Sequence, residues 1–199
     1  MDIRNQDGDS VDINVLEKME QDLVKHYIEA EDTVLELGAR YGSVSCTINA
    51  NLNCKTNQVV VEPDDRVWAA LARNKAANGC GFHIVEGFVS AKKLGLVNLD
   101  EYYGGYGATF VEAPESSIPV FTLKAIMDRY GLSFNVLVAD CEGFLEVFFD
   151  ENPEFYDELR LVVFEADYPD KCNYDKIRAR LKEKGFIEFV GGFQNVWKR

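Results

Sequence analysis

The sequence predicts an α/β fold with a mainly parallel sheet covered by helices on both faces. Short apolar runs alternate with amphipathic segments of helical length along the 199 residues, and parallel strands need such crossovers between them. Glycines and acids follow the first apolar runs, at the place where ligands bind to parallel sheets. No internal repeat or linker-like tract divides the chain, so we expect one domain over residues 1–199.

The first half of the chain contains an N-terminal helix, two strand and helix units and a third strand. Apolar residues between Val15 and Ile28 recur mostly three and four apart, which predicts an N-terminal helical segment within residues 1–30 and a helix over 12–29 capped by Asp12. Beyond it we expect strands at 33–37, 58–61 and 82–85, with helices ending near residue 50 and spanning 66–78.

The second half begins with an irregular region over residues 87–119, which we expect to form a long functional loop or a small hairpin on the acceptor side. The chain ends on a predicted antiparallel hairpin, with Gly191 and Gly192 as its two-residue turn and Phe193 and Trp197 in the core. The elements expected between them are helices at 122–130, 142–152 and 175–184 and strands at 135–139 and 159–164.

The charge balance argues against several kinds of partner. The formal net charge is −13, which repels phosphate backbones and disfavours nucleic acid. No apolar run approaches the roughly 20 residues that cross a bilayer, and residues 1–10 lack the apolar core of a signal peptide. The five cysteines form no C-x-x-C pair, so neither zinc nor disulfides are implied. We therefore expect a cytoplasmic protein without membrane insertion.

Two acids and two glycines indicate a nucleoside site. Glu36 precedes Gly38 and Gly42, which allow the backbone to approach a ligand and start a helix that favours an anionic group. Glu62 follows the second strand, where an acid binds ribose hydroxyls. The dinucleotide and triphosphate motifs G-x-G-x-x-G and G-K-[ST] do not occur there. S-adenosylmethionine, which carries a cation and a carboxylate, fits both acids, although either acid could merely cap the following helix.

Three segments resemble the motifs of FkbM-family methyltransferases: residues 34–42 (VLELGARYG), 59–64 (VVVEPD) and 135–143 (NVLVADCEG). The resemblance covers about residue 31 to the end, and Asp140-x-Glu142-Gly143 is its most specific part. It implies a Rossmann-like class I methyltransferase with a seven-stranded sheet, which transfers a methyl group from S-adenosylmethionine to an oxygen, often on a sugar or glycan. Val138 and Leu145 depart from the Lys and Glu usual in the family, so acceptor placement could differ.

The resemblance also extends to methyltransferase domains of larger glycan-synthesising proteins, such as those of large algal viruses. It therefore implies a carbohydrate or glycan acceptor. We further expect either a homodimer or covalent fusion to glycosyltransferase domains, and the host cytoplasm as the location if the protein is viral.

The strand ends supply the candidate catalytic groups. A sugar hydroxyl must lose its proton to attack a methyl group, and Asp140 is the first candidate for the base, with Glu165 second and Glu142 as a helper. These three carboxylates could instead bind Mg²⁺ or Mn²⁺, or Asp140 and Glu142 could simply cap the next helix. The residues expected to bind the donor are Glu36, Gly38, Ala39, Tyr41, Gly42, Ser43, Glu62, Pro63, Gly87, Phe88, Asp140 and Cys141.

Aromatic residues among glycines provide candidates for acceptor binding. Tyr102, Tyr103 and Tyr106 could stack on a sugar from a closing loop or could be ordinary packing residues, and Asp167 and Tyr168 follow the fifth strand close to the site. The same donor site would serve a methyltransferase for a small non-sugar metabolite. A non-catalytic domain that binds the donor or a protein partner is the remaining alternative.

Overall fold

A seven-stranded sheet forms the centre of the computed structural model, which describes residues 1–15, 17–99 and 107–199. Its order is β10-β11-β9-β8-β1-β2-β3. The strands from β9 to β3 run parallel, and β11 pairs antiparallel with both β9 and β10. The strands of this sheet are β1 (Val34–Leu37), β2 (Gln58–Glu62), β3 (His83–Glu86), β8 (Val136–Ala139), β9 (Leu161–Glu165), β10 (Ile187–Val190) and β11 (Gln194–Lys198).

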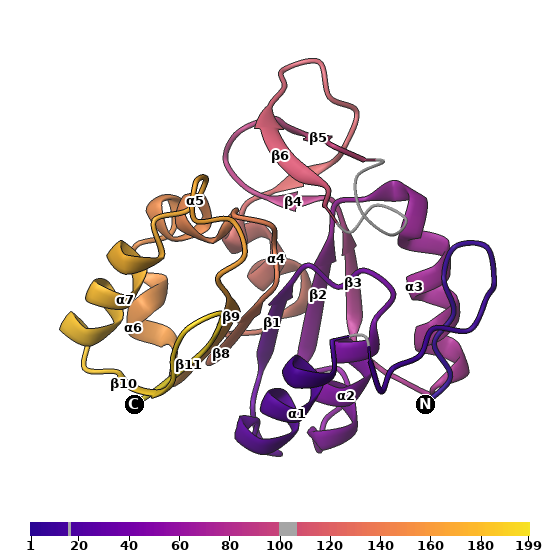
Figure 1. Cartoon of the computed structure of the whole chain (residues 1–199), viewed down its shortest axis with the longest axis horizontal. Helices are drawn as coiled ribbons and strands as arrows, with labels where there is room; N and C mark the ends of the chain where they lie inside the picture. The colour runs from indigo at the N-terminus through magenta and orange to yellow at the C-terminus, as the bar shows by residue number, and fades with distance from the viewer. Residues whose placement is uncertain (16, 100–106) are drawn as a thin grey trace.

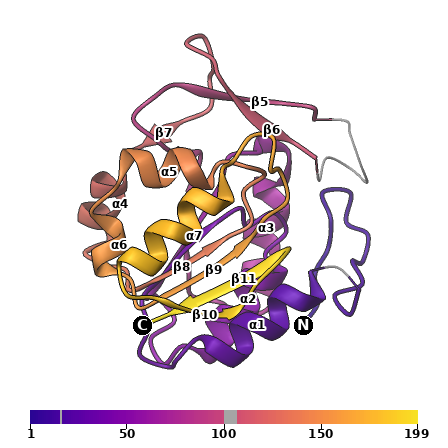
Figure 2. The ribbon, with the colours of Figure 1, turned by 60° about the vertical axis from the view of Figure 1, so that its left-hand side comes forward.

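Helices cover both faces of the sheet, as the sequence predicts (Figures 1 and 2). Val34 packs with α1 and α2, whereas Leu35 and Leu37 belong to the core on the side of α4, α5 and α7. This division follows from the two-residue period of a strand, which sends neighbouring side chains to opposite faces. The helices are α1 (Lys18–Tyr27), α2 (Ser43–Asn51), α3 (Asp65–Ala77), α4 (Leu123–Tyr130), α5 (Leu145–Glu151), α6 (Phe155–Glu158) and α7 (Tyr174–Glu183).

A small arm stands above the carboxyl edge of the sheet, at the top of Figure 1. It consists of the antiparallel pair β5 (Leu94–Val97) and β6 (Thr109–Glu112), joined to the body by the short parallel pair β4 (Phe88–Val89) and β7 (Val120–Phe121). The prediction of a small hairpin within residues 87–119 is therefore confirmed. The arm places residues of β5 and β6 over the ends of the central strands.

Two helices start later than predicted because left-handed residues precede them. Glu17 has φ 52°, so α1 begins at Lys18, and Asp12 accepts a hydrogen bond from the Asn14 amide instead of capping the helix. Glu142 and Gly143 have φ 51° and 84°, and α5 begins only at Leu145. The reading in which Asp140 and Glu142 merely cap a helix is thus wrong.

The C-terminal hairpin differs from the predicted one in its turn. Three residues, 191–193, connect β10 and β11, and the register shifts between Glu188 and Val190. Phe193 lies in this connection with 59% of its surface exposed, although the sequence placed it in the core, whereas Trp197 is fully buried as expected. In the described residues we find no helix with the length and apolar character needed to cross a membrane.

Candidate functional site

A cavity lies where β1, β2 and β8 end, beneath the β5–β6 arm. About 750 Å³ of space there is free of protein atoms, a volume that includes open solvent. Most of its side chains are apolar or acidic. The described residues that line it are Glu17, Leu37, Gly38, Arg40, Val61, Glu62, Pro63, Asp64, Gly87, Phe88, Val89, Leu96, Ala108, Phe110, Asp140, Cys141, Glu142 and Phe144.

Gly38 is required where the ends of β1 and β8 come together. Its φ is +86°, and a Cβ atom there would lie only 1.6 Å from the carbonyl oxygen of Asp140. The amide of Asp140 in turn donates to the carbonyl of Leu37 at 3.0 Å. Only glycine allows this close approach, and it brings Gly38 and Asp140 together in the wall of the cavity.

Glu62 ends β2 and faces the cavity. Its carboxylate oxygens accept hydrogen bonds from the backbone amides of Arg40 at 2.7 Å and Asp64 at 2.8 Å, so the side chain is held in one orientation. Burial raises the pKa of Glu62 to about 7, while these two amides act to lower it. Each carboxylate oxygen can accept a second hydrogen bond, and the group can therefore bind a pair of hydroxyls while remaining fixed.

Glu36 does not line the cavity. It projects from β1 beneath α2, where its carboxylate accepts hydrogen bonds from Ser45 Oγ at 2.8 Å and Gln58 Nε2 at 3.0 Å. Only 1% of its surface is exposed, and burial raises its pKa to about 8. The predicted contact between Glu36 and the donor stays a prediction. In the structure, the hydrogen bonds of Glu36 join β1 to β2 and α2.

Replacing Glu36 with glutamine should remove a pH dependence of stability. The carboxyl keeps its proton up to about pH 8 in the folded state, against an ordinary value of 4.5, so stability falls as pH rises between these values. The linked loss for wild type is at most about 1.4 kcal/mol per pH unit. Urea unfolding at pH 5, 6, 7 and 8 should therefore show wild type losing stability relative to Glu36→Gln.

The exposed Glu158→Gln on α6 is the matched control, and its curve should run parallel to that of wild type. If the Glu36→Gln curve also runs parallel to wild type, Glu36 does not hold its proton in the fold.

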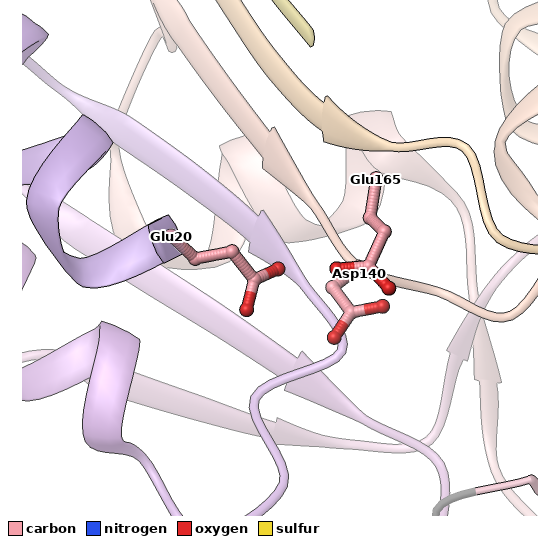
Figure 3. A group of neighbouring side chains, drawn as sticks. All are labelled: Glu20, Asp140 and Glu165. Atoms are coloured by element: carbon pink, nitrogen blue, oxygen red, sulfur yellow. The ribbon is translucent and has the colours of Figure 1, made fainter. Parts of the chain in front are cut away.

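A group of carboxylates from distant parts of the chain meets beside the cavity. Glu20 on α1, Asp140 after β8 and Glu165 at the end of β9 have ligand oxygens within 4.8 Å of one another, and Figure 3 shows the three side chains converging. Asp140 also forms such a group with Glu142 and Asp167. The structure thus brings the three predicted catalytic residues together, with Asp140 shared between both groups.

Mutual repulsion and burial make these carboxyls weak acids. Burial raises the pKa of Asp140 well above its usual range, and the charges of Glu20 and Glu165 raise it further. Burial and the neighbouring Asp167 raise the pKa of Glu142 to about 9. The pKa of Glu165 rises to about 7 for the same two reasons. A cation placed among these groups would relieve the repulsion, so the site favours a positively charged ligand.

Two acids of the site were missed in the sequence. Glu17 lines the cavity from the turn before α1, and Glu20 joins Asp140 and Glu165 from the first turn of α1. Both lie in residues 12–29, for which the sequence predicted only an amphipathic helix, and neither belongs to a recognisable motif. Arg40 also lines the cavity. It lies in the turn from Gly38 to Gly42, the glycine turn, and its guanidinium is 3.9 Å from the carboxylate of Asp64.

The remaining predicted residues fall into three groups. Asp167 lies close to Asp140, and its Oδ1 accepts hydrogen bonds from the Tyr174 hydroxyl at 2.6 Å and the Tyr168 amide at 2.8 Å. Tyr168 itself is absent from the described lining. The predicted acceptor-binding residues Tyr102, Tyr103 and Tyr106 lie outside the described residues. The predicted donor-binding residues that are absent from the described lining of the cavity are Glu36, Ala39, Tyr41, Gly42 and Ser43.

Comparison with known proteins gives structural likeness without sequence likeness. No protein-family model matches the chain, and no curated protein matches it. The resemblance to the FkbM family therefore stays a prediction.

Among solved structures, an O-methyltransferase from Bacillus cereus in complex with SAH has a TM-score of 0.56 and 13% identity, with 92% of this chain and 80% of that chain covered. Precorrin-6y C5,15-methyltransferase from Geobacter metallireducens gives a TM-score of 0.55 and 13% identity over 95% and 93% of the two chains. An rRNA methylase from Streptococcus thermophilus gives 0.54 and 8% identity over 91% and 94%.

The names of these three proteins refer to different kinds of substrate. At such low sequence identity, the likeness to them concerns the fold alone. The strand order, the antiparallel β11 and the position of the cavity at the carboxyl ends of the strands agree with it. The chain therefore has the Rossmann-like fold of class I methyltransferases.

Proposed function

We propose that this protein is an S-adenosylmethionine-dependent O-methyltransferase that acts on a sugar hydroxyl. The observation that carries the proposal is the cavity at the ends of β1, β2 and β8, which is lined by Glu62, Asp140 and Glu142. In this fold such a cavity is where a nucleoside ligand binds.

The residues present fit the donor. Gly38 leaves the turn after β1 free of a side chain that would collide with Asp140. Glu62 presents a fixed carboxylate for the ribose hydroxyls, and Phe88 and Val89 offer apolar surface. The surrounding carboxyls with raised pKa values would be stabilised by a cationic ligand. When bound, S-adenosylmethionine supplies an electrophilic methyl group.

Asp140 is the best placed base. It lines the cavity, and burial together with the charges of Glu20 and Glu165 raises its pKa, so that its carboxylate can accept a hydroxyl proton. Glu142 beside it could orient the acceptor. An Asp140 oxygen would accept the proton of the acceptor hydroxyl, while the methyl group passes from the donor sulfur to the hydroxyl oxygen and S-adenosylhomocysteine is left. The cavity would have to hold the acceptor in line for this transfer.

A divalent cation is the alternative use of the same carboxylates. Asp140, Glu142 and Glu165 are oxygen donors of the kind that Mg²⁺ or Mn²⁺ prefers, and Asp140 belongs to both groups of converging acids. A metal ion there would bind two sugar hydroxyls and lower the pKa of the attacking one. Acceptor assays with and without Mg²⁺ distinguish this arrangement from direct proton transfer to Asp140.

A small non-sugar metabolite is the second candidate acceptor. Three phenylalanines form an aromatic wall on the arm side, with ring centroids 5.1 Å apart for Phe110 and Phe144 and 6.0 Å apart for Phe88 and Phe144. Such a wall suits a flat apolar molecule as well as the face of a sugar ring.

The proposal is tested in two steps. Calorimetric titration with S-adenosylmethionine and S-adenosylhomocysteine should first show binding of both. Release of S-adenosylhomocysteine is then measured with neutral monosaccharides and with planar phenols as acceptors. Turnover with sugars supports the proposal, whereas turnover only with phenols favours the second candidate. Donor binding without any turnover would favour a non-catalytic domain, and absence of donor binding would overturn the assignment.

Glu62→Gln should weaken donor binding about ten- to a hundred-fold, because the charge-assisted hydrogen bonds to the ribose are lost. The measurement is calorimetric titration with S-adenosylhomocysteine and with 5′-methylthioadenosine. Both ligands carry the ribose, so both affinities should fall by a similar factor, while the exposed Glu158→Gln leaves them unchanged. An unchanged affinity in Glu62→Gln would contradict the placement of the ribose.

A further inference from the structure

The amino-acid end of the donor carries an ammonium group, and Glu36 is poorly placed to bind it. Both oxygens of the Glu36 carboxylate already accept hydrogen bonds, one from Ser45 Oγ and one from Gln58 Nε2. The side chain is 1% exposed and is absent from the described lining of the cavity. Contact with a ligand in the cavity would require Glu36 to leave both partners, so the ammonium needs another anionic group.

Glu17 is an acid that does line the cavity. It directly precedes α1, and its backbone is left-handed (φ 52°), so the helix begins at the next residue, Lys18. Its carboxylate accepts a hydrogen bond from the hydroxyl of Ser43, the first residue of α2. Ser43 is 1% exposed, so this hydrogen bond fixes the Glu17 carboxylate beside the start of α2.

The walls of the cavity offer both charges that an amino-acid group needs. Glu17 lines the cavity, and so does Arg40 in the glycine turn, whose positive charge is near enough to lower the pKa of Glu17. An amino-acid group carries its ammonium on the carbon next to its carboxylate, so a carboxylate and a guanidinium close together match its two charges. The N-terminal segment and the glycine turn would thus bind opposite charges of one ligand group.

We propose that Glu17 carries the negative charge that binds the ammonium group of the donor, and that Glu36 instead joins β1, β2 and α2. This inference rests on the function proposed above. Burial raises the pKa of Glu17, while the Ser43 hydroxyl and the charge of Arg40 act to lower it. An arriving ammonium would favour the ionised carboxylate and recover part of the cost of burying it.

The test compares two ligands that differ in the amino-acid end. S-adenosylhomocysteine has the ammonium, whereas 5′-methylthioadenosine has the same adenosine and sulfur without it. In Glu17→Gln, which keeps an oxygen that can accept from Ser43, the Kd for S-adenosylhomocysteine should rise at least about ten-fold. The Kd for 5′-methylthioadenosine should stay unchanged. Calorimetric titration of the full chain gives both values, and no acceptor is needed.

Two further variants define the alternatives. Glu36→Gln should change both affinities by the same factor, and the exposed Glu158→Gln should change neither. The inference is overturned if Glu17→Gln leaves S-adenosylhomocysteine binding intact, if it weakens both ligands equally, or if Glu36→Gln is the variant that weakens S-adenosylhomocysteine selectively. If wild type binds neither ligand, the proposed function itself fails, and this outcome is distinct from the other three.

Discussion

Gly38→Ala will destabilise the protein by at least about 3 kcal/mol. A side chain at this position must adopt φ +86°, and its Cβ would overlap the Asp140 carbonyl oxygen, 1.6 Å away. That oxygen belongs to the backbone between β8 and α5, which cannot move aside without disturbing the pairing of β1 and β8. Urea unfolding monitored by circular dichroism measures the loss, and donor binding should disappear with it.

Gly131→Ala separates the two causes of this effect. Gly131 ends α4 with φ +66°, and no atom lies within 4 Å of a Cβ built there. Its replacement therefore costs only the left-handed backbone, about 1–2 kcal/mol. A similar loss of stability in both variants would show that a Cβ atom at Gly38 does not collide with the Asp140 carbonyl oxygen.

Asp140→Asn should lower kcat by about a hundred- to ten-thousand-fold while S-adenosylhomocysteine still binds. Asparagine has nearly the same shape but cannot accept the hydroxyl proton, and its neutral side chain also removes one charge from the crowded acids. The fall is measured with the acceptor that gives turnover in the wild type. Calorimetry on the same preparation shows whether the donor site is intact.

Glu165→Gln is the comparison for the assignment of the base. Glu165 lies beside Asp140 and accepts a hydrogen bond from Gln194 at 2.6 Å, but it is absent from the described lining of the cavity. Its replacement should shift the pH profile of kcat with a much smaller fall than in Asp140→Asn. If Asp140→Asn retains turnover and Glu165→Gln loses it, the base is Glu165.

Local patterns were sufficient for most elements of the sheet. The mainly apolar runs at 33–37, 58–61 and 135–139 each became a strand of the central sheet, because a strand buried on both faces is apolar over most of its length. The helical patterns failed at the starts of α1 and α5, where left-handed residues precede the helices. The periodicity that predicted a helix from residue 12 could not show that Glu17 has φ 52°.

The site was predictable only in part. Gly38, Glu62, Asp140 and Glu142 could be found in the sequence because they lie at or just after the ends of strands of a parallel sheet, and all four line the cavity. Glu17 could not be found in this way, since it reaches the cavity from the turn before α1. Its carboxylate accepts a hydrogen bond from Ser43, which is 26 positions away in the sequence.

The sequence by itself determined the order of strands and helices, the glycine turn after the first strand and the acids at the strand ends, because each depends on local periodicity and backbone freedom. Only the tertiary structure decided which acids act together. Glu36 and Glu62 read alike along the chain, yet the two-residue period of β1 turns Glu36 under α2 while Glu62 faces the cavity at the end of β2. Side-chain direction and distant contacts, which no local pattern encodes, thus separate a structural carboxylate from one that can bind a ligand.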